Sequence, residues 1–487
     1  MKKKMKSVLF GAFSFMAAAS AFGAAEIDRV LVRQQWPWSE KVAIDFVLTN
    51  VTSVTQIDCT VRRGESVLPM PEEAFAGDLY EIEKDGAYRI VFDPSYLDGR
   101  PANGETLSFT LTPSTMAEDS IYREVLYKIF DLEAKTVTDV TRGALLSGKY
   151  GSVEKDYSRI GEGYSSPLQD VLIWTGVTNY PGAKTTKLVM RKIPAGTFKY
   201  GKFDFWEQTT QFTIEVSKPF WIGVFELTQK QYSFFRNNDY KGDHYYKPGE
   251  VSANLGDEKP VNNIRLYQHI YSGEPRDWDA SKGALLNLKT MFASSGTYNF
   301  DLPTQAMWFR ALRADSTTYY YDGIKGTPSD LAYNDRMAVL GRFAANGGIV
   351  QNEDGSATTN GVAAVGSYRP NAFGLYDMIG NVAEATKDSG GFQSGDNNAR
   401  DPLKTMSGNA YGVFGAAWHS KAELPYAGNL NGVRDLQLIN RYPYVGLRLS
   451  FFEGENPFKP VETPEVTPEE TPEDPPVEQP EETPETE

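Results

Sequence analysis

The chain contains a single cysteine, Cys59, among its 487 residues. One thiol cannot form a disulfide within the chain, and it cannot build a zinc site that needs several cysteines. The folded parts must therefore be stabilised by their hydrophobic cores, and a chain of this length can form two or three domains. Cys59 lies in an alternating stretch at residues 54–61, which predicts a cysteine buried on a β-strand. A reactive thiol is the alternative at this position.

The first residues have the order of a secretory signal peptide. The chain begins with a basic segment that contains Lys2, Lys3, Lys4 and Lys6. An apolar stretch follows at residues 7–22, and small residues come after it, so we expect a signal peptide at residues 1–24. An uncleaved membrane anchor is the alternative, but the stretch is shorter than the ~20 residues that span a bilayer. The sequence thus predicts an exported protein (periplasmic, on the cell surface or secreted) with no membrane span after cleavage.

The formal net charge is −15, and acidic residues are concentrated near the C-terminus. Nucleic-acid binding requires a basic surface, so this charge argues against a nucleic acid as a partner. Residues 453–487 are dominated by proline, glutamate and threonine, with repeats of Thr-Pro-Glu. Such a segment buries little apolar surface and repels itself, which predicts a disordered acidic tail that acts as a solvated spacer.

Residues 25–114 contain short stretches of β-type sequence. They lie at residues 29–33, 42–48, 88–92 and 107–111, with Asp-Gly and Asn-Gly turn signals between them. Several short strands at this spacing predict a β-sandwich domain of immunoglobulin-like architecture. No binding motif is visible there, so a spacer or packing role is the default. Residues 115–183 form a connecting region that the sequence assigns to neither neighbour.

From residue 184 the chain carries a series of distinct sequence blocks. In chain order they span residues 189–198, 212–228, 259–264, 302–313 and 370–384, and a Gly-Leu-Arg strand follows at 446–448. Thr228 and Thr304 stand directly before stretches with helical spacing, so both are expected to be helix N-caps. In the second of these helices we expect Trp308, Ala311 and Leu312 to face the core.

These blocks resemble the formylglycine-generating enzyme family, also called the sulfatase-modifying factor family, and they follow the family's order across residues 184–452. The most similar block is Pro-Asn-Ala-Phe-Gly-Leu-Tyr-Asp-Met-Ile-Gly-Asn-Val-Ala-Glu, at residues 370–384. The resemblance implies a loop-rich domain with a C-type-lectin-like fold. The expected fold class is therefore α+β: a β-sandwich, then the lectin-like domain, then the disordered tail.

The last block supplies two carboxylates, Asp377 and Glu384, around a turn that Gly380 permits. Carboxylate and carbonyl oxygens are the ligands that calcium prefers. Without a metal, the same residues would form a turn held by hydrogen bonds to the backbone. The resemblance implies a structural calcium ion, bound by the side chains of Asp377 and Glu384 and by the carbonyls of Gly380 and Val382.

The family's redox chemistry is not expected here. The resemblance implies a pair of copper-binding cysteines late in the domain, but residues 406–448 contain none. A thiolate is both the nucleophile and the soft-metal ligand, and serine or alanine cannot replace it. The tryptophans that commonly flank the loop glutamate in the family are Ala383 and Ala385 in this chain. The three histidines are widely spaced, at His244, His269 and His419. We therefore expect neither copper nor iron.

The sequence thus favours an exported, non-catalytic protein that acts in binding or as a structural surface module. Its ligand would be a glycan, a peptide or another protein. Tyrosines at residues 240–246 and 319–321 can stack on a ligand, or they can fill an irregular core. The alternative is an enzyme: a formylglycine-generating oxidoreductase, or a related metal-dependent enzyme with an altered active site.

Overall fold

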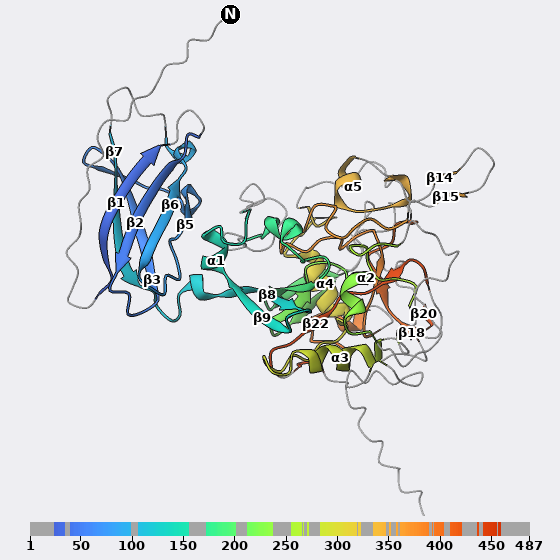
Figure 1. The fold of residues 1–487 in the computed structure, drawn as a ribbon. Helices are drawn as coiled ribbons and strands as arrows, with labels where there is room; N and C mark the ends of the chain where they lie inside the picture. Colours follow the sequence, from blue (N-terminus) through green and yellow to red (C-terminus); the bar gives the residue numbers. More distant parts are fainter. Residues whose placement is uncertain are drawn as a thin grey trace, which may run out of the picture.

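A computed structural model gives the fold of the chain (Figure 1). The residues that the structure describes are 24–34, 39–98, 106–154, 172–200, 212–236, 255–264, 266, 270–271, 283–318, 320–322, 335–346, 350–351, 357–358, 361–388, 392, 394–403, 410–420, 436–437, 442–454 and 456–458. The predicted signal peptide, up to residue 23, and the predicted tail from residue 459 lie outside them.

The N-terminal part consists of two antiparallel sheets. The first has the order β1-β2-β6-β5, with bounds Glu26–Gln34, Val42–Thr49, Gly86–Phe92 and Phe75–Gly77. The second has the order β4-β3-β7, with bounds Ser66–Leu68, Thr55–Arg63 and Leu107–Thr115. The four β-type stretches that the sequence predicts here are all strands.

One hydrophobic core lies between these sheets. Inward-facing residues alternate along β2 and β7, and Phe92 of the first sheet meets Phe109 of the second edge-on, with ring centroids 5.4 Å apart. Cys59 lies on β3 as predicted, is half-buried and packs against the edge of this core. Burial raises the pKa of Cys59 to about 12, so the thiol stays protonated near neutral pH.

The connecting region contributes to the second part of the molecule. A five-stranded antiparallel sheet has the order β22-β13-β10-β8-β9, with bounds Ser450–Phe451, Phe220–Gly223, Lys187–Ile193, Val125–Asp131 and Thr136–Thr141. Strands β8 and β9 come from residues 115–183, which the sequence left unassigned. They share a sheet with strands that follow residue 184. The domain boundary between residues 183 and 184 stays a prediction.

Short sheets and helices surround this sheet (Figure 1). The remaining strands are β11 Gly196–Tyr200, β12 Phe212–Val216, β14 Val350–Gln351, β15 Ala357–Thr358, β16 Ala383–Ala385, β17 Ala399–Arg400, β18 Ala410–Tyr411, β19 Val413–Phe414, β20 Leu436–Gln437 and β21 Val445–Gly446. The α-helices are α1 Arg142–Leu146, α2 Gln229–Ser233, α3 Gly283–Met291, α4 Gln305–Arg313 and α5 Asp335–Leu340. The 3₁₀ helices are Glu72–Ala74, Pro94–Tyr96, Ile121–Arg123, Thr175–Asn179, Ala344–Asn346 and Ser394–Asp396. The described residues are rich in short strands and poor in helix.

Two predicted helix caps are confirmed. The Thr228 side chain accepts a hydrogen bond from the Gln231 backbone N–H, and the Gln231 side-chain oxygen accepts one from the Thr228 backbone N–H, which completes a capping box before α2. Thr304 caps α4 by accepting from the Met307 N–H. All nine residues of α4 are buried, including the predicted core residue Trp308, so this helix runs through the interior of the domain.

The two parts of the molecule meet at a packed junction. Tyr80 of the sandwich stacks on Tyr122 with ring centroids 4.0 Å apart, and Thr141 donates a hydrogen bond of 2.8 Å to Glu81. Gly143 lies under Tyr80, where an added Cβ would come within 2.9 Å of the tyrosine Cβ.

Within the described residues, no helix combines the length and apolarity that a membrane crossing requires.

Candidate functional site

The loop that the sequence singled out is a buried turn before β16. Asp377, Gly380 and Asn381 all have positive φ angles, of 57°, 83° and 58°. At Gly380 an added Cβ would lie 2.6 Å from the Arg342 carbonyl oxygen, so the backbones approach too closely for any side chain. The turn therefore needs glycine at this position, as the sequence analysis expects.

Glu384, on β16, is held by Arg448. The guanidinium Nη2 lies 2.7 Å from Glu384 Oε1, and Nε lies 3.0 Å from Oε2. The indole N–H of Trp308 donates to the same carboxylate over 2.8 Å. The Arg448 and Glu384 side chains are 0% and 1% exposed, so this is a buried ion pair with well-defined partners.

Arg448 uses all of its hydrogen-bond donors. Besides Glu384, its Nη1 donates to the carbonyls of Gly223 and Val224 over 2.8 and 2.9 Å, and its Nη2 donates to the Tyr376 carbonyl over 2.7 Å. Burial opposes the guanidinium charge, but the Glu384 carboxylate outweighs it, and the pKa of Arg448 is raised above its ordinary value. One side chain thus ties together β13, the turn and β16.

A third carboxyl group, Glu226, lies against the same turn. Its Oε1 accepts from the Val382 N–H over 3.0 Å, and its Oε2 accepts from the Asn381 amide over 2.6 Å. Burial, followed by the nearby charges of Asp377 and Glu384, raises the pKa of Glu226 well above its ordinary range. No motif in the sequence indicates a role for Glu226. The sequence does carry one sign that Glu226 is important: it is a carboxylate within the apolar run at residues 220–227. A glutamate is rarely buried unless other groups pair with it.

Asp377 has only one of its oxygens satisfied by the described residues. Its Oδ2 accepts from the Gly366 N–H over 2.6 Å, whereas the buried Oδ1 has no hydrogen-bond partner among them. Burial raises the pKa of Asp377 to about 6, against lesser opposing effects of the Gly366 hydrogen bond and the Arg448 charge. The interior therefore favours the neutral form of this carboxyl group at mildly acidic pH.

The predicted calcium ligands lie on the turn and at the start of β16. Glu384 is committed to Arg448 and Trp308, which leaves Asp377 Oδ1 as the one open carboxylate oxygen of the pair. Calcium takes 6–8 oxygen ligands. Across the part of the chain that the structure describes, no cluster of three His, Cys, Asp or Glu residues is suited to a metal ion. Calcium binding by Asp377, Gly380, Val382 and Glu384 stays a prediction.

The aromatic candidates that the structure describes are interior residues. Tyr320 and Tyr321 are 2% and 1% exposed, so they fill the core instead of forming a surface. Tyr411 and Trp418 are buried as well. An open groove beside these two residues would have favoured ligand binding. His419 stacks near Tyr444, with ring centroids 4.6 Å apart. His244, His269, the tyrosines at 240–246 and Tyr319 lie outside the described residues.

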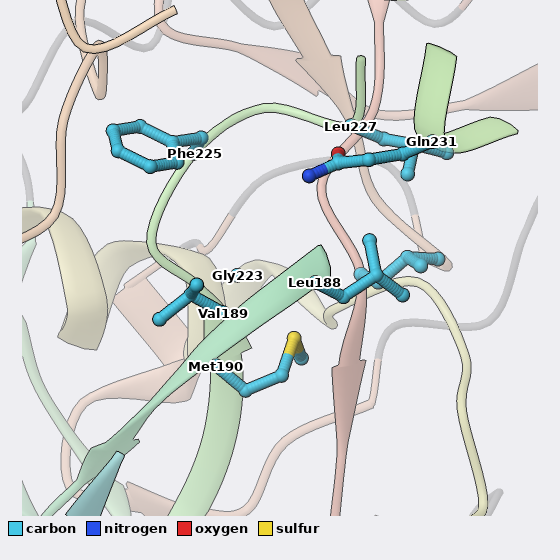
Figure 2. A pocket seen from close by; sticks show the side chains of 8 residues that line it. Leu188, Val189, Met190, Gly223, Phe225, Leu227 and Gln231 are labelled. Atoms are coloured by element: carbon cyan, nitrogen blue, oxygen red, sulfur yellow. The ribbon is translucent and has the colours of Figure 1, made fainter. Parts of the chain in front are cut away.

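One interior hollow lies between β10, the segment after β13 and α2 (Figure 2). Its volume is about 10 Å³, close to the minimum for a single water molecule. Leu188, Met190 and Phe225 line it, and the Gln231 amide at its edge already donates to the carbonyls of Ala183 and Lys187. The hollow is therefore a packing defect with no room for a ligand.

A sequence profile of the "sulfatase-modifying factor enzyme 1-like domain" matches residues 179–427, just over half of the chain. The chain belongs to the sulfatase-modifying factor family. The match ends before β21 and β22, yet β22 pairs with β13 and Arg448 reaches Glu384, so these last strands complete the family domain. The resemblance inferred from the five sequence blocks is thus confirmed.

Three solved structures are each similar to 54% of this chain. PvdO from Pseudomonas aeruginosa is 18% identical, with a TM-score of 0.39 over 54% of this chain and 94% of that one. Treponema denticola variable protein 1 is 21% identical, with a TM-score of 0.39 over 54% and 95%. CarF is 16% identical, with a TM-score of 0.32 over 54% and 97%. No curated protein matches the chain.

Proposed function

We propose that this chain is an exported protein whose sulfatase-modifying factor domain is non-catalytic and serves as a binding or structural module. One observation carries the proposal: the family domain contains no cysteine. The only thiol, Cys59, lies on β3 of the N-terminal sandwich and has a raised pKa. A protonated thiol in another part of the chain is a poor nucleophile and a poor copper ligand.

The buried charges support the same proposal. A catalytic acid or base must come within hydrogen-bond reach of its substrate. Glu226, Asp377 and Glu384 are at most 1% exposed, and Arg448 is fully buried. Their hydrogen bonds run to the backbone, to one another and to the side chains of Trp308 and Asn381, which supports a role in holding the loops of the domain together.

The surroundings of Glu384 point in the same direction. Ala383 and Ala385 flank it where the family commonly has tryptophans, and both alanines are buried. Alanine offers neither a ring on which a substrate can stack nor an indole N–H donor. The proposed ligand is consequently a glycan, a peptide or a protein bound elsewhere on the domain. The predicted signal peptide supports a location in the periplasm, on the cell surface or outside the cell.

The strand order also supports an immunoglobulin-like N-terminal domain. The first, second, sixth and fifth strands form one sheet, and the third and seventh lie together in the other. Immunoglobulin domains place strands A, B, E and D in one sheet and C and F in the other. Such a domain would serve as a spacer or packing domain beside the family domain.

Copper binding tests the proposal. The full chain would be titrated with copper(I) against a competing chelator, with Cys59→Ser as the matched control. We expect no stoichiometric binding by either protein. Tight binding of one copper ion that survives Cys59→Ser would mean that the family domain has other metal ligands, and it would favour the enzyme alternative.

A further inference from the structure

A polar-rimmed hollow of about 230 Å³ lies on the family domain, away from the buried turn. It is bounded by the last turn of α3, the start of α4 and the end of β22. We propose that this hollow binds a small organic carboxylate, with the acid group at Lys387 and Lys289 and a short apolar body on the floor. This site is independent of the proposed non-catalytic function.

The floor of the hollow is apolar and buried. Leu302, Met307, Phe451 and Phe452 line it, and each is at most 4% exposed. Apolar side chains that close a hollow favour a ligand with hydrocarbon surface, because burial removes that surface from water. The volume is below the ~300 Å³ at which drug-sized pockets begin, so the ligand must be smaller than a drug-sized molecule.

The rim carries positive charge in a chain of net charge −15. Lys387 makes an ion pair with Asp301 Oδ2 and keeps 28% of its side chain exposed. Asp301 Oδ1 accepts from the Tyr271 hydroxyl over 2.7 Å and from the Leu302 N–H over 2.8 Å. The carboxylate that positions Lys387 is thus itself held in place. An ammonium has three donor hydrogens, and the contact with Asp301 uses one.

The start of α4 does not supply the anion site. The Met307 N–H donates to Thr304, and the Gln305 N–H donates to Asp388 Oδ1 over 2.6 Å. Both groups have acceptors already, so the attraction for a bound acid would come from the lysine charges. Lys289, in the last turn of α3, also lines the hollow and adds a second positive charge. A carboxylate with a hydrocarbon body fits this hollow better than phosphate, because phosphate has no apolar surface to place against Leu302, Met307 and Phe451.

Methyl NMR on the full chain tests the proposal. Met307 lies in the floor, and its methyl signal among the 11 methionines would be assigned by Met307→Leu. The probes are isobutyrate, its neutral isostere isobutyramide, and inorganic phosphate. We expect isobutyrate to shift the Met307 signal saturably, and each of the other two probes to bind at least about tenfold more weakly.

Two lysine variants and one control complete the experiment. Lys289→Glu and Lys387→Gln should each weaken isobutyrate binding at least about tenfold. Lys230→Gln, which removes a lysine of α2 outside the hollow, should leave it unchanged. The other methionine signals report whether each variant stays folded, and Lys289→Glu leaves the Asp301 ion pair intact. The proposal is overturned if isobutyrate does not saturate, if isobutyramide or phosphate binds equally well, or if Lys289→Glu has no effect.

Discussion

Arg448 and Glu384 stand 64 residues apart in the sequence and form a fully buried ion pair at 2.7 Å. The glutamate belongs to the sequence block that most resembles the family, and the arginine lies between β21 and β22. Since Arg448 also binds three backbone carbonyls, the pair adds side-chain links to the short ladders that β16 forms with β21 and β13 forms with β22. In a domain with little regular structure, such a side chain fixes the loops.

Removing the arginine should destabilise the chain strongly. Arg448→Met leaves Glu384 buried without a counter-charge, and breaking a buried pair in this way costs about 3–5 kcal/mol. We expect a loss of that size in the free energy of unfolding, measured by urea denaturation at neutral pH. The double variant with Glu384→Gln should recover about 2 kcal/mol of it, since the amide keeps an acceptor for Trp308 and carries no charge. A single variant within about 1 kcal/mol of the wild type would contradict this role.

The turn itself should not tolerate a side chain at its glycine. Gly380→Ala forces an alanine into a left-handed conformation and brings its Cβ against the Arg342 backbone. We expect a loss of about 2 kcal/mol or more in the free energy of unfolding. Gly395→Ala is the matched control, because nothing lies within 4 Å of its added Cβ, and it should stay within about 0.5 kcal/mol. Equal effects of the two substitutions would rule out the steric explanation.

Asp377 should make stability depend on pH. Its pKa is raised from 3.8 to about 6 in the folded state, so folding favours the protonated group. The stability that this group contributes is therefore fully present below pH 3.8 and is lost as the pH rises through about 6. Asp377→Asn keeps an acceptor for the Gly366 N–H and never ionises. Above pH 6 it should be more stable than the wild type by up to about 3 kcal/mol, and at pH 3.8 or below the two should nearly coincide.

If calcium binds at the same turn, replacing Asp377 should lower the stability of the chain instead of raising it. If Asp377, Gly380, Val382 and Glu384 hold a calcium ion, the melting temperature should fall when a chelator is added. Asp377→Ala and Glu384→Ala should then cost more stability in calcium than in chelator. Differential scanning calorimetry of the full chain measures both effects. A melting temperature that does not change with chelator means that these four residues do not form a calcium site.

Local sequence signals predicted local structure well. Thr228 and Thr304 are the caps that their positions suggested, because an N-cap depends on a few neighbouring residues. The sandwich strands follow from period-two alternation in the same way. The family blocks placed the turn at Gly380 correctly for a related reason, since a positive φ angle is a property of one residue.

Partners that are distant in the sequence were not predicted. Arg448 appeared only as part of a terminal strand, and Glu226 appeared without a role, since nothing local indicates which buried charges will meet. The family resemblance implied Glu384 as a calcium ligand, which stays a prediction, and nothing near Glu384 in the sequence indicated that its carboxylate binds Arg448 and Trp308. Strands β8 and β9 were left unassigned because β8 joins the sheet through β10, which lies beyond an intervening segment. The hollow at Lys387 gives no signal in the sequence, as its lining comes from several separate segments.

The most direct test of a non-catalytic family domain is an oxidation assay. The full chain, loaded with copper(I) under oxygen, would be incubated with a peptide that carries the cysteine motif recognised by sulfatase-modifying enzymes. Mass spectrometry would then follow the peptide. We expect its cysteine to be unchanged, because the domain has no thiol with which to engage it. Copper-dependent conversion of that cysteine to an aldehyde would contradict the proposed function.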